Sequence, residues 1–245
     1  MTTFYDDYYV NSGPGSPSWE FRELGGAAKA RNIAQIAPAS LGSVLDIGVG
    51  TGAVLAHLDR LGVGERYTAI DISRSAIDLI RGREDISRLV DARTYDGERI
   101  PFDDATFDLA ILSHVIEHLA DPAPLIREAC RVSRLVAIEV PLEDNLHIHI
   151  KTGLLRSRYR QRIGHIQWFN ARSFAALLTS CGCDVLDQKV AYVEPESIRY
   201  GKSGLARLAA DARIGLRATL GAVAPGLYLK LATEHCIALV SARKA

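Results

Sequence analysis

The stretch "VLDIGVGTG", residues 44–52, places the tightest constraint on how this chain folds. The apolar, mostly β-branched residues Val44, Leu45 and Ile47 predict a buried strand, and Asp46 interrupts it with a carboxylate. Gly48, Gly50 and Gly52 follow at two-residue spacing. A glycine-rich turn between a strand and a helix lets the backbone approach a ligand closely. The stretch therefore predicts a strand, a ligand-binding turn and a helix, in that order.

The rest of the chain alternates short apolar runs with helical stretches, which is typical of a mostly parallel sheet covered by helices. We expect strands at residues 43–47, 66–70, 92–95, 107–112, 134–140, 183–193 and 235–242. We expect helices at residues 25–37, 52–61, 75–81, 122–131 and 171–180. The predicted fold class is α/β, a seven-stranded, mostly parallel sheet with helices on both faces.

We expect residues 1–245 to form one domain, with a ligand-binding core at 40–142 and an N-terminal segment at 1–40. Two segments are longer than a simple alternation of strands and helices requires. Residues 142–170 form a long connection, and residues 200–226 resemble a single inserted helix. Loops of such length are usually functional, so both are expected to be helical covers over a binding site.

Composition narrows the class of partner. Lysine and arginine together number 29, as do aspartate and glutamate, which argues against nucleic-acid binding. No apolar run reaches the roughly 18 residues that span a bilayer, and the N-terminus lacks a signal-peptide pattern. Four cysteines without a C-x-x-C pair indicate reduced thiols, so a cytoplasmic protein is expected.

The ligand of the glycine turn can be narrowed by charge. Gly48, Gly50 and Ala53 satisfy the dinucleotide pattern G-x-G-x-x-[GA], with Asp71 placed to hold a ribose. Asp46, however, would repel a pyrophosphate and suits a cationic ligand without phosphate, such as S-adenosylmethionine. A carboxylate tied to backbone amides of the turn is the structural alternative, and both roles are compatible.

Three further motifs follow in order: "AIDIS" at 69–73, "YDGERIPFDDATFDLAILSHVIEHLADP" at 95–122, and "LIREACRVSRLVAIEVP" at 125–141. Together with residues 44–52 they resemble the class I S-adenosylmethionine-dependent methyltransferases, of the kind that modify small molecules in ubiquinone biosynthesis. The resemblance covers residues 40–142 and, more loosely, 165–183. It implies a Rossmann-like sheet whose last strand is antiparallel, with S-adenosylmethionine as cofactor and S-adenosylhomocysteine as product.

The resemblance also assigns cofactor contacts. It places Asp46 and the backbone of the three turn glycines at the methionine end, and Asp71 at the ribose hydroxyls. The remaining cofactor contacts that it implies are Ile72 against the adenine, Asp96 with Gly97 at the adenine amino group, and Ser113 beside the sulfonium. Asp91 is the alternative to Asp96.

Methyl transfer to a hydroxyl calls for a base, and histidine is the commonest base near neutral pH. The candidates are His114 after the fourth strand, His165 before the sixth-strand helix, and His147 after the fifth strand, with His149 beside it. A pocket-lining or structural role is the alternative for each.

The segment "HVIEHL" offers His114, Glu117 and His118 on one helical face. Similar ubiquinone-biosynthesis O-methyltransferases bind a divalent metal here through Glu-x-x-Glu-His. Because histidine replaces the first glutamate, we expect a hydrogen-bond network and no metal.

Two further clusters bear on the acceptor. Lys151, Arg156, Arg158, Arg160 and Arg162 suggest an anionic acceptor or a solvated helix face. Phe4, Tyr5, Tyr8 and Tyr9 suggest a lid over the cofactor or a frayed terminus.

The sequence therefore predicts a methyltransferase acting on a hydroxyl of a small molecule, such as a sugar, a glycan intermediate or a secondary metabolite. Methylation of an amine or amino sugar is the first alternative. A nicotinamide-dependent dehydrogenase and a non-catalytic cofactor-binding module are more distant ones. A homodimer remains open.

Overall fold

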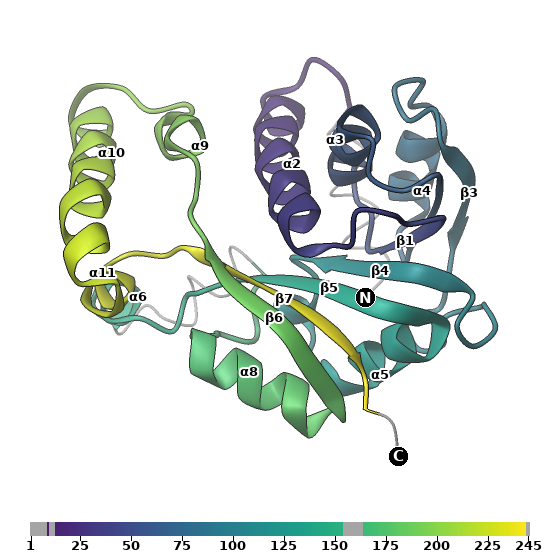
Figure 1. Cartoon of the computed structure of the whole chain (residues 1–245). Helices are drawn as coiled ribbons and strands as arrows, with labels where there is room; N and C mark the ends of the chain where they lie inside the picture. Colours follow the sequence, from purple (N-terminus) through teal and green to yellow (C-terminus); the bar gives the residue numbers. More distant parts are fainter. Residues whose placement is uncertain (1–8, 10–12, 154–163, 244–245) are drawn as a thin grey trace.

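The computed structural model describes residue 9 and residues 13–153 and 164–243. Seven strands form one sheet in the order β3-β2-β1-β4-β5-β7-β6 (Figure 1). The strands are β1 (Ser43–Ile47), β2 (Arg66–Asp71), β3 (Leu89–Thr94), β4 (Phe107–Ser113), β5 (Ser133–Pro141), β6 (Cys183–Ala191) and β7 (His235–Ala242). The first five strands pair in parallel, and β7 is antiparallel to both β5 and β6. The predicted fold class, including the antiparallel last strand, is confirmed.

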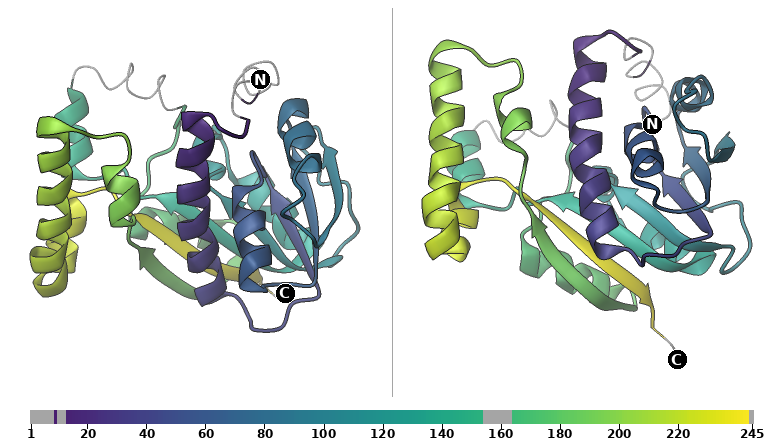
Figure 2. Two further views of the ribbon diagram at one scale, coloured as in Figure 1. Left: turned by 90° about the horizontal axis from the view of Figure 1, so that it is seen from above. Right: turned by 45° about the horizontal axis from the view of Figure 1, so that its top comes forward.

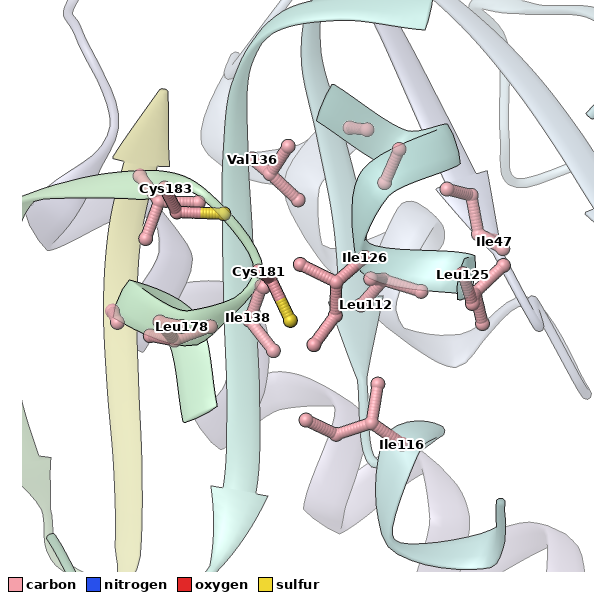
Figure 3. Packing of buried hydrophobic residues seen from close by; sticks show 14 of the residues in the cluster. Ile47, Leu112, Ile116, Leu125, Ile126, Val136, Ile138, Leu178, Cys181 and Cys183 are labelled. Carbon is pink, nitrogen blue, oxygen red and sulfur yellow. The ribbon is translucent and has the colours of Figure 1, made fainter. Parts of the chain in front are cut away.

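Helices cover both faces of this sheet (Figures 1 and 2). One face carries α2 (Pro17–Ile36), α3 (Ala53–Leu61) and α4 (Arg74–Arg81), and the other carries α5 (Ala123–Val132) and α8 (Ala171–Ser180). Each face has its own apolar core. On the α5 and α8 face, Ile126, Leu112, Ile138 and Leu178 pack together, and Ile116 anchors the turn after β4 (Figure 3). Burial of these side chains fixes the ends of β4 and β5.

The strand order reverses between β1 and β4, because β2 and β3 lie on one side of β1 and β5 lies on the other. In open α/β sheets, ligands bind outside the carboxyl ends of the strands at such a reversal. The glycine turn follows β1, and His114 follows β4. Both predicted halves of the site, the glycine turn and His114, therefore lie at the carboxyl ends of the parallel strands.

Three expected elements have bounds that differ by two or more residues in the structure. Helix α2 begins at Pro17, not at residue 25, because the Ser16 hydroxyl caps it by accepting the Trp19 N–H at 3.1 Å. Strand β3 lies at Leu89–Thr94 instead of 92–95, and β6 ends at Ala191 instead of residue 193.

The single helix expected at 200–226 is wrong. The chain forms α9 (Pro195–Arg199), α10 (Gly204–Leu216), a π-helical turn (Arg217–Gly221) and α11 (Pro225–Leu231). Pro225 begins a new helix because it lacks the N–H that would continue the previous one. Helix α11 packs against α6 (Leu146–Thr152), which lies in the other long connection. In Figure 1 these helices stand at the side of the sheet beyond β5 and β7.

No helix in the described ranges combines the length and the apolar content that a membrane span requires.

Candidate active site

The turn after β1 has the backbone conformation that only glycine adopts freely. Gly48, Gly50 and Gly52 have φ values of +76°, +56° and +74°. The Gly48 N–H donates to the Ile70 carbonyl at 2.8 Å, which ties the turn to the end of β2. A Cβ on Gly50 would lie 3.0 Å from the Tyr9 hydroxyl oxygen. The N-terminal segment thus reaches the glycine turn at Tyr9, while Phe4, Tyr5 and Tyr8 lie outside the described residues.

Asp71 at the end of β2 holds the same turn. Its Oδ2 accepts the Gly50 N–H and its Oδ1 accepts the Ser73 N–H, both at 2.9 Å. These two bonds fix the Asp71 carboxylate beside the glycine turn, where ligand hydroxyls could reach it. Asp71 therefore combines a structural role with the ability to bind a diol.

Asp46 is 3% exposed, and no described residue donates a hydrogen bond to its carboxylate. Burial, followed by the charge of Asp71, raises the pKa of Asp46 to about 7, and the charge of Lys29 opposes this shift. The alternative that backbone amides tie Asp46 down is therefore not observed among the described residues. A bound cation next to such a buried carboxylate would stabilise its ionised form.

The predicted adenine contacts lie together. A Cβ on Gly97 would lie 3.2 Å from Ile72 Cγ2, so these two residues face each other across the loop after β3. Asp96 is exposed, and its Oδ1 accepts the N–H groups of Glu98 and Arg99, which lowers its pKa. Asp91, the alternative to Asp96, lies within β3 and pairs with Arg93.

His114 begins the segment after β4 with φ +58°, an uncommon conformation for a residue with a side chain. Its N–H donates to the Glu139 carbonyl at 2.9 Å, which holds the ring at the end of the strand. The His114 Nε2 atom and the Ser113 hydroxyl are buried without a hydrogen-bond partner. Burial, followed by the charges of Lys29 and His235, keeps the pKa of His114 well below its ordinary value. At neutral pH this imidazole is therefore uncharged and able to accept a proton.

Two buried glutamates flank His114. Glu117 Oε1 lies 3.2 Å from His114 Nδ1, and burial raises the pKa of Glu117. Glu139 Oε1 accepts hydrogen bonds from Asn32 at 3.0 Å and from His235 at 3.1 Å. Although burial alone would raise the pKa of Glu139, the His235 hydrogen bond and nearby positive charges hold it at about 2. The His114 and His235 rings meet edge to face with centroids 4.4 Å apart.

The connection after β5 brings His165 against His118, which follows β4. His165 Nδ1 lies 2.6 Å from Glu143 Oε2, and His118 Nδ1 lies 3.0 Å from the Gly164 carbonyl. Burial alone would lower the pKa of His165, but the Glu143 hydrogen bond raises it. His149 pairs with Asp144 at 2.8 Å.

The side chains of His147 and Lys151 lie outside the described structure, as do Arg156, Arg158, Arg160 and Arg162. His147 as a base and the basic cluster as an anion site therefore stay predictions.

Two groups of side chains have the residue types and spacing that could hold a metal ion. They are His114 with Glu139 and His235, and Glu117 with His118 and His165, each with ligand atoms within 4.8 Å of one another. In the first group Asn32 and His235 already bind Glu139, and the charge of Lys29 acts on it.

The structure adds residues that the motifs did not indicate. Lys29 and Asn32 reach the site from α2, and His235 reaches it from the start of β7. Glu139 had a usable signal, since it is a carboxylate near the end of an apolar strand, as Asp46 is. Lys29, Asn32 and His235 have no such local signal.

A methyltransferase-domain family model matches residues 19–188, which is more than half of the chain. The chain is also similar to the demethylmenaquinone methyltransferase of Roseiflexus sp. (strain RS-1), with 34% identity over 120 residues. That match covers 47% of this chain and 48% of the relative, so it spans about half the length of the relative.

Solved structures share the fold at low identity. A chain from the complex of the Haloferax volcanii Trm112 methyltransferase activator with its methyltransferase has a TM-score of 0.67 at 17% identity, and the match covers 98% of both chains. The phosphoethanolamine N-methyltransferase 2 of Haemonchus contortus, solved with S-adenosylhomocysteine, has a TM-score of 0.60 at 15% identity, covering 98% of this chain and 57% of that one. The dinucleotide alternative is not supported by these matches. The chain belongs to the methyltransferase-domain family of class I S-adenosylmethionine-dependent enzymes, with S-adenosylmethionine as cofactor and S-adenosylhomocysteine as product.

Proposed function

We propose that this methyltransferase acts on a hydroxyl group of its small-molecule acceptor, with His114 as the general base. The observation that carries the proposal is the His114 Nε2 atom, which is buried, unpartnered and on a neutral ring at the reversal of the strand order. The Glu117 carboxyl lies 3.2 Å from Nδ1 without hydrogen-bond alignment, and we propose that its electrostatic attraction favours the tautomer with the proton on Nδ1, which leaves Nε2 to accept a proton.

The cofactor fits the other half of the site. We propose that Asp46 binds the ammonium of the methionine moiety and that the Gly48, Gly50 and Gly52 backbone accommodates its chain. Lys29, whose charge acts on Asp46, is suited to the methionine carboxylate.

For the nucleoside half, we propose that Asp71 binds the ribose hydroxyls, Ile72 packs on the adenine, and Asp96 with Gly97 binds its amino group. The position of Asp71 at the end of β2, held against the glycine turn, and the proximity of Ile72 to Gly97 support this placement.

The cofactor supplies a methyl group on a sulfonium, which is an excellent leaving group. The chain must then align the acceptor and remove its proton. His114 Nε2 takes the hydroxyl proton while the new oxygen–carbon bond forms, and the electron pair of the broken sulfur–carbon bond stays on sulfur. Glu117 stabilises the resulting imidazolium. We propose that the acceptor side is lined by Ser113 and His165. The covers at 142–170 and 200–226 enclose it.

The elevated pKa of Asp46 predicts pH-dependent cofactor binding. Below about pH 7 the free carboxyl is protonated, and an ammonium ligand binds the ionised form, so binding releases a proton. S-Adenosylhomocysteine affinity should rise up to about tenfold per pH unit below pH 7 and level off above it. Calorimetry at pH 6 to 8 in two buffers of different ionisation enthalpy measures both effects. Asp46→Asn should remove the pH dependence, and pH-independent binding by the wild type would contradict the placement of the ammonium.

The reaction itself can be tested with trideuteromethyl-labelled cofactor and a panel of sugars, glycan intermediates and phenolic metabolites. The expected product carries the labelled methyl group on oxygen, located by tandem mass spectrometry and NMR. A product labelled only on nitrogen would replace hydroxyl with amine methylation, the second candidate. S-Adenosylhomocysteine binding without turnover of any acceptor would support the non-catalytic module.

A further inference from the structure

Unpartnered polar atoms gather on the acceptor side of the site. Among the described residues, five buried side-chain atoms without a hydrogen-bond partner lie on consecutive or neighbouring groups here: Ser113 Oγ, His114 Nε2, both Glu117 carboxylate oxygens and Glu139 Oε2. Both glutamates are at most 1% exposed. Buried polar groups normally have partners, so this concentration indicates a ligand that supplies them.

Hydrogen-bond acceptors outnumber hydrogen-bond donors among these unpartnered atoms. Glu117 and Glu139 contribute three oxygen acceptors, His114 Nε2 contributes a fourth, and only the Ser113 hydroxyl donates. Glu117 Oε1 is at ion-pair distance from His114 Nδ1, but without the alignment of a hydrogen bond. A matching ligand brings several hydrogen-bond donors, whereas one hydroxyl brings only one.

The charges agree with the hydrogen-bond count. Burial lowers the pKa of Lys29, and the charges of Glu139 and Glu117 oppose that shift; Lys29 makes no hydrogen bond or ion pair with a described residue. If Lys29 neutralises the methionine carboxylate as proposed above, the two glutamates lose that compensation once the cofactor binds. Two buried carboxylates then face the acceptor, which favours a positively charged acceptor group.

We infer that the acceptor is an amino alcohol, whose protonated amine binds Glu117 and Glu139 while its hydroxyl lies at His114 Nε2. This inference rests on the proposed function and adds the chemical class of the substrate. It also explains why Glu139 accepts two hydrogen bonds through Oε1 while its Oε2 is unused. The two carboxylates hold the amine, and His114 handles the proton of the hydroxyl.

The test compares amines with their matched alcohols on protein saturated with S-adenosylhomocysteine. The pairs are glucosamine with glucose, tyramine with 4-(2-hydroxyethyl)phenol, and ethanolamine with ethylene glycol, each titrated by calorimetry. In at least one pair the amine should bind about 10- to 100-fold more tightly, the range for a hydrogen bond to a charged group. Glu117→Gln and Glu139→Gln should each reduce that preference to less than about threefold.

Glu128→Gln is the matched control, because this glutamate of α5 already has Arg131 as its partner. It should keep the amine preference. Glu139 also binds Asn32 and His235, so folding of Glu139→Gln is checked by its cofactor affinity; Glu117→Gln provides the second variant.

The outcomes separate the inference from the proposed function. Equal binding within all three pairs, no binding by any amine, or a preference that survives both variants would overturn the inference. So would a stoichiometric divalent metal in the purified protein that is lost in Glu117→Gln or Glu139→Gln. Oxygen-methylated product without an amine preference would overturn the inference alone, whereas loss of cofactor binding in the wild type would overturn the proposed function.

Discussion

Gly50→Val should lower the affinity for S-adenosylhomocysteine by at least about 100-fold. Gly50 has φ +56°, where a β-branched residue is strained by roughly 1–3 kcal/mol, and the new Cβ would press on the Tyr9 hydroxyl at 3.0 Å. Relaxing the backbone would break the 2.9 Å bond from the Gly50 N–H to Asp71, at a further cost of about 1.5–3 kcal/mol. Calorimetric titration measures the loss directly.

Gly215→Val is the matched control for this change. Gly215 lies in α10, and no atom lies within 4 Å of the position of a new Cβ. Its variant should bind the cofactor product within about twofold of wild type, as expected for a surface substitution away from the site. Wild-type affinity in Gly50→Val would show that the glycine turn does not hold the cofactor.

His114→Asn should lower kcat by about 10²- to 10⁴-fold on a hydroxyl acceptor, the usual contribution of a general base. Asparagine tolerates positive φ better than most residues, so the variant removes the imidazole while keeping the backbone at +58°. S-Adenosylhomocysteine affinity should change little, because the base acts on the acceptor. Steady-state kinetics at saturating cofactor, together with calorimetry, separates these two effects.

The pH profile gives a second readout for His114. Because the pKa of His114 is well below its ordinary value, wild-type kcat at saturating cofactor should stay flat from about pH 6 to 7.5, a range in which an unperturbed imidazole would lose its charge and the rate would rise. The rate of His114→Asn should instead rise with pH as solvent takes over the proton. His57→Asn is the control, because His57 lies in α3 and has Glu23 as its partner. Its kcat should follow the wild-type pH profile. Unchanged kcat in His114→Asn, or an equal loss in His165→Asn only, would reassign the base.

The cofactor half of the site could be predicted from the sequence because its signals are local. The glycines at 48, 50 and 52 follow β1 directly, Asp46 is the next-to-last residue of β1, and Asp71 is the last residue of β2. A tight turn requires particular residues at fixed offsets, so the chemistry is visible within a few positions of the chain. The family match agrees with the cofactor deduced from Asp46.

Predictions that depended on long segments were less successful. The interval 200–226 contains alanine, leucine and glycine at helical spacing throughout, and Pro225 alone marks the break that separates α10 from α11. Helix α2 was predicted too short because its start depends on a single capping serine before Pro17.

The sequence by itself determined the α/β sheet, the glycine turn and the identity of the cofactor, because these depend on hydrophobic periodicity and on residues a few positions apart. Only the tertiary structure brought together the residues that we propose for the acceptor side. The residues concerned are more than 90 positions apart in sequence: Lys29 in α2, Glu139 in β5 and His235 in β7. They meet because β7 inserts beside β5 and α2 packs against these strands. The burial of Lys29, which lowers its pKa, and the burial of the unpartnered Glu139 Oε2 are properties of that packing and of no single stretch of the chain.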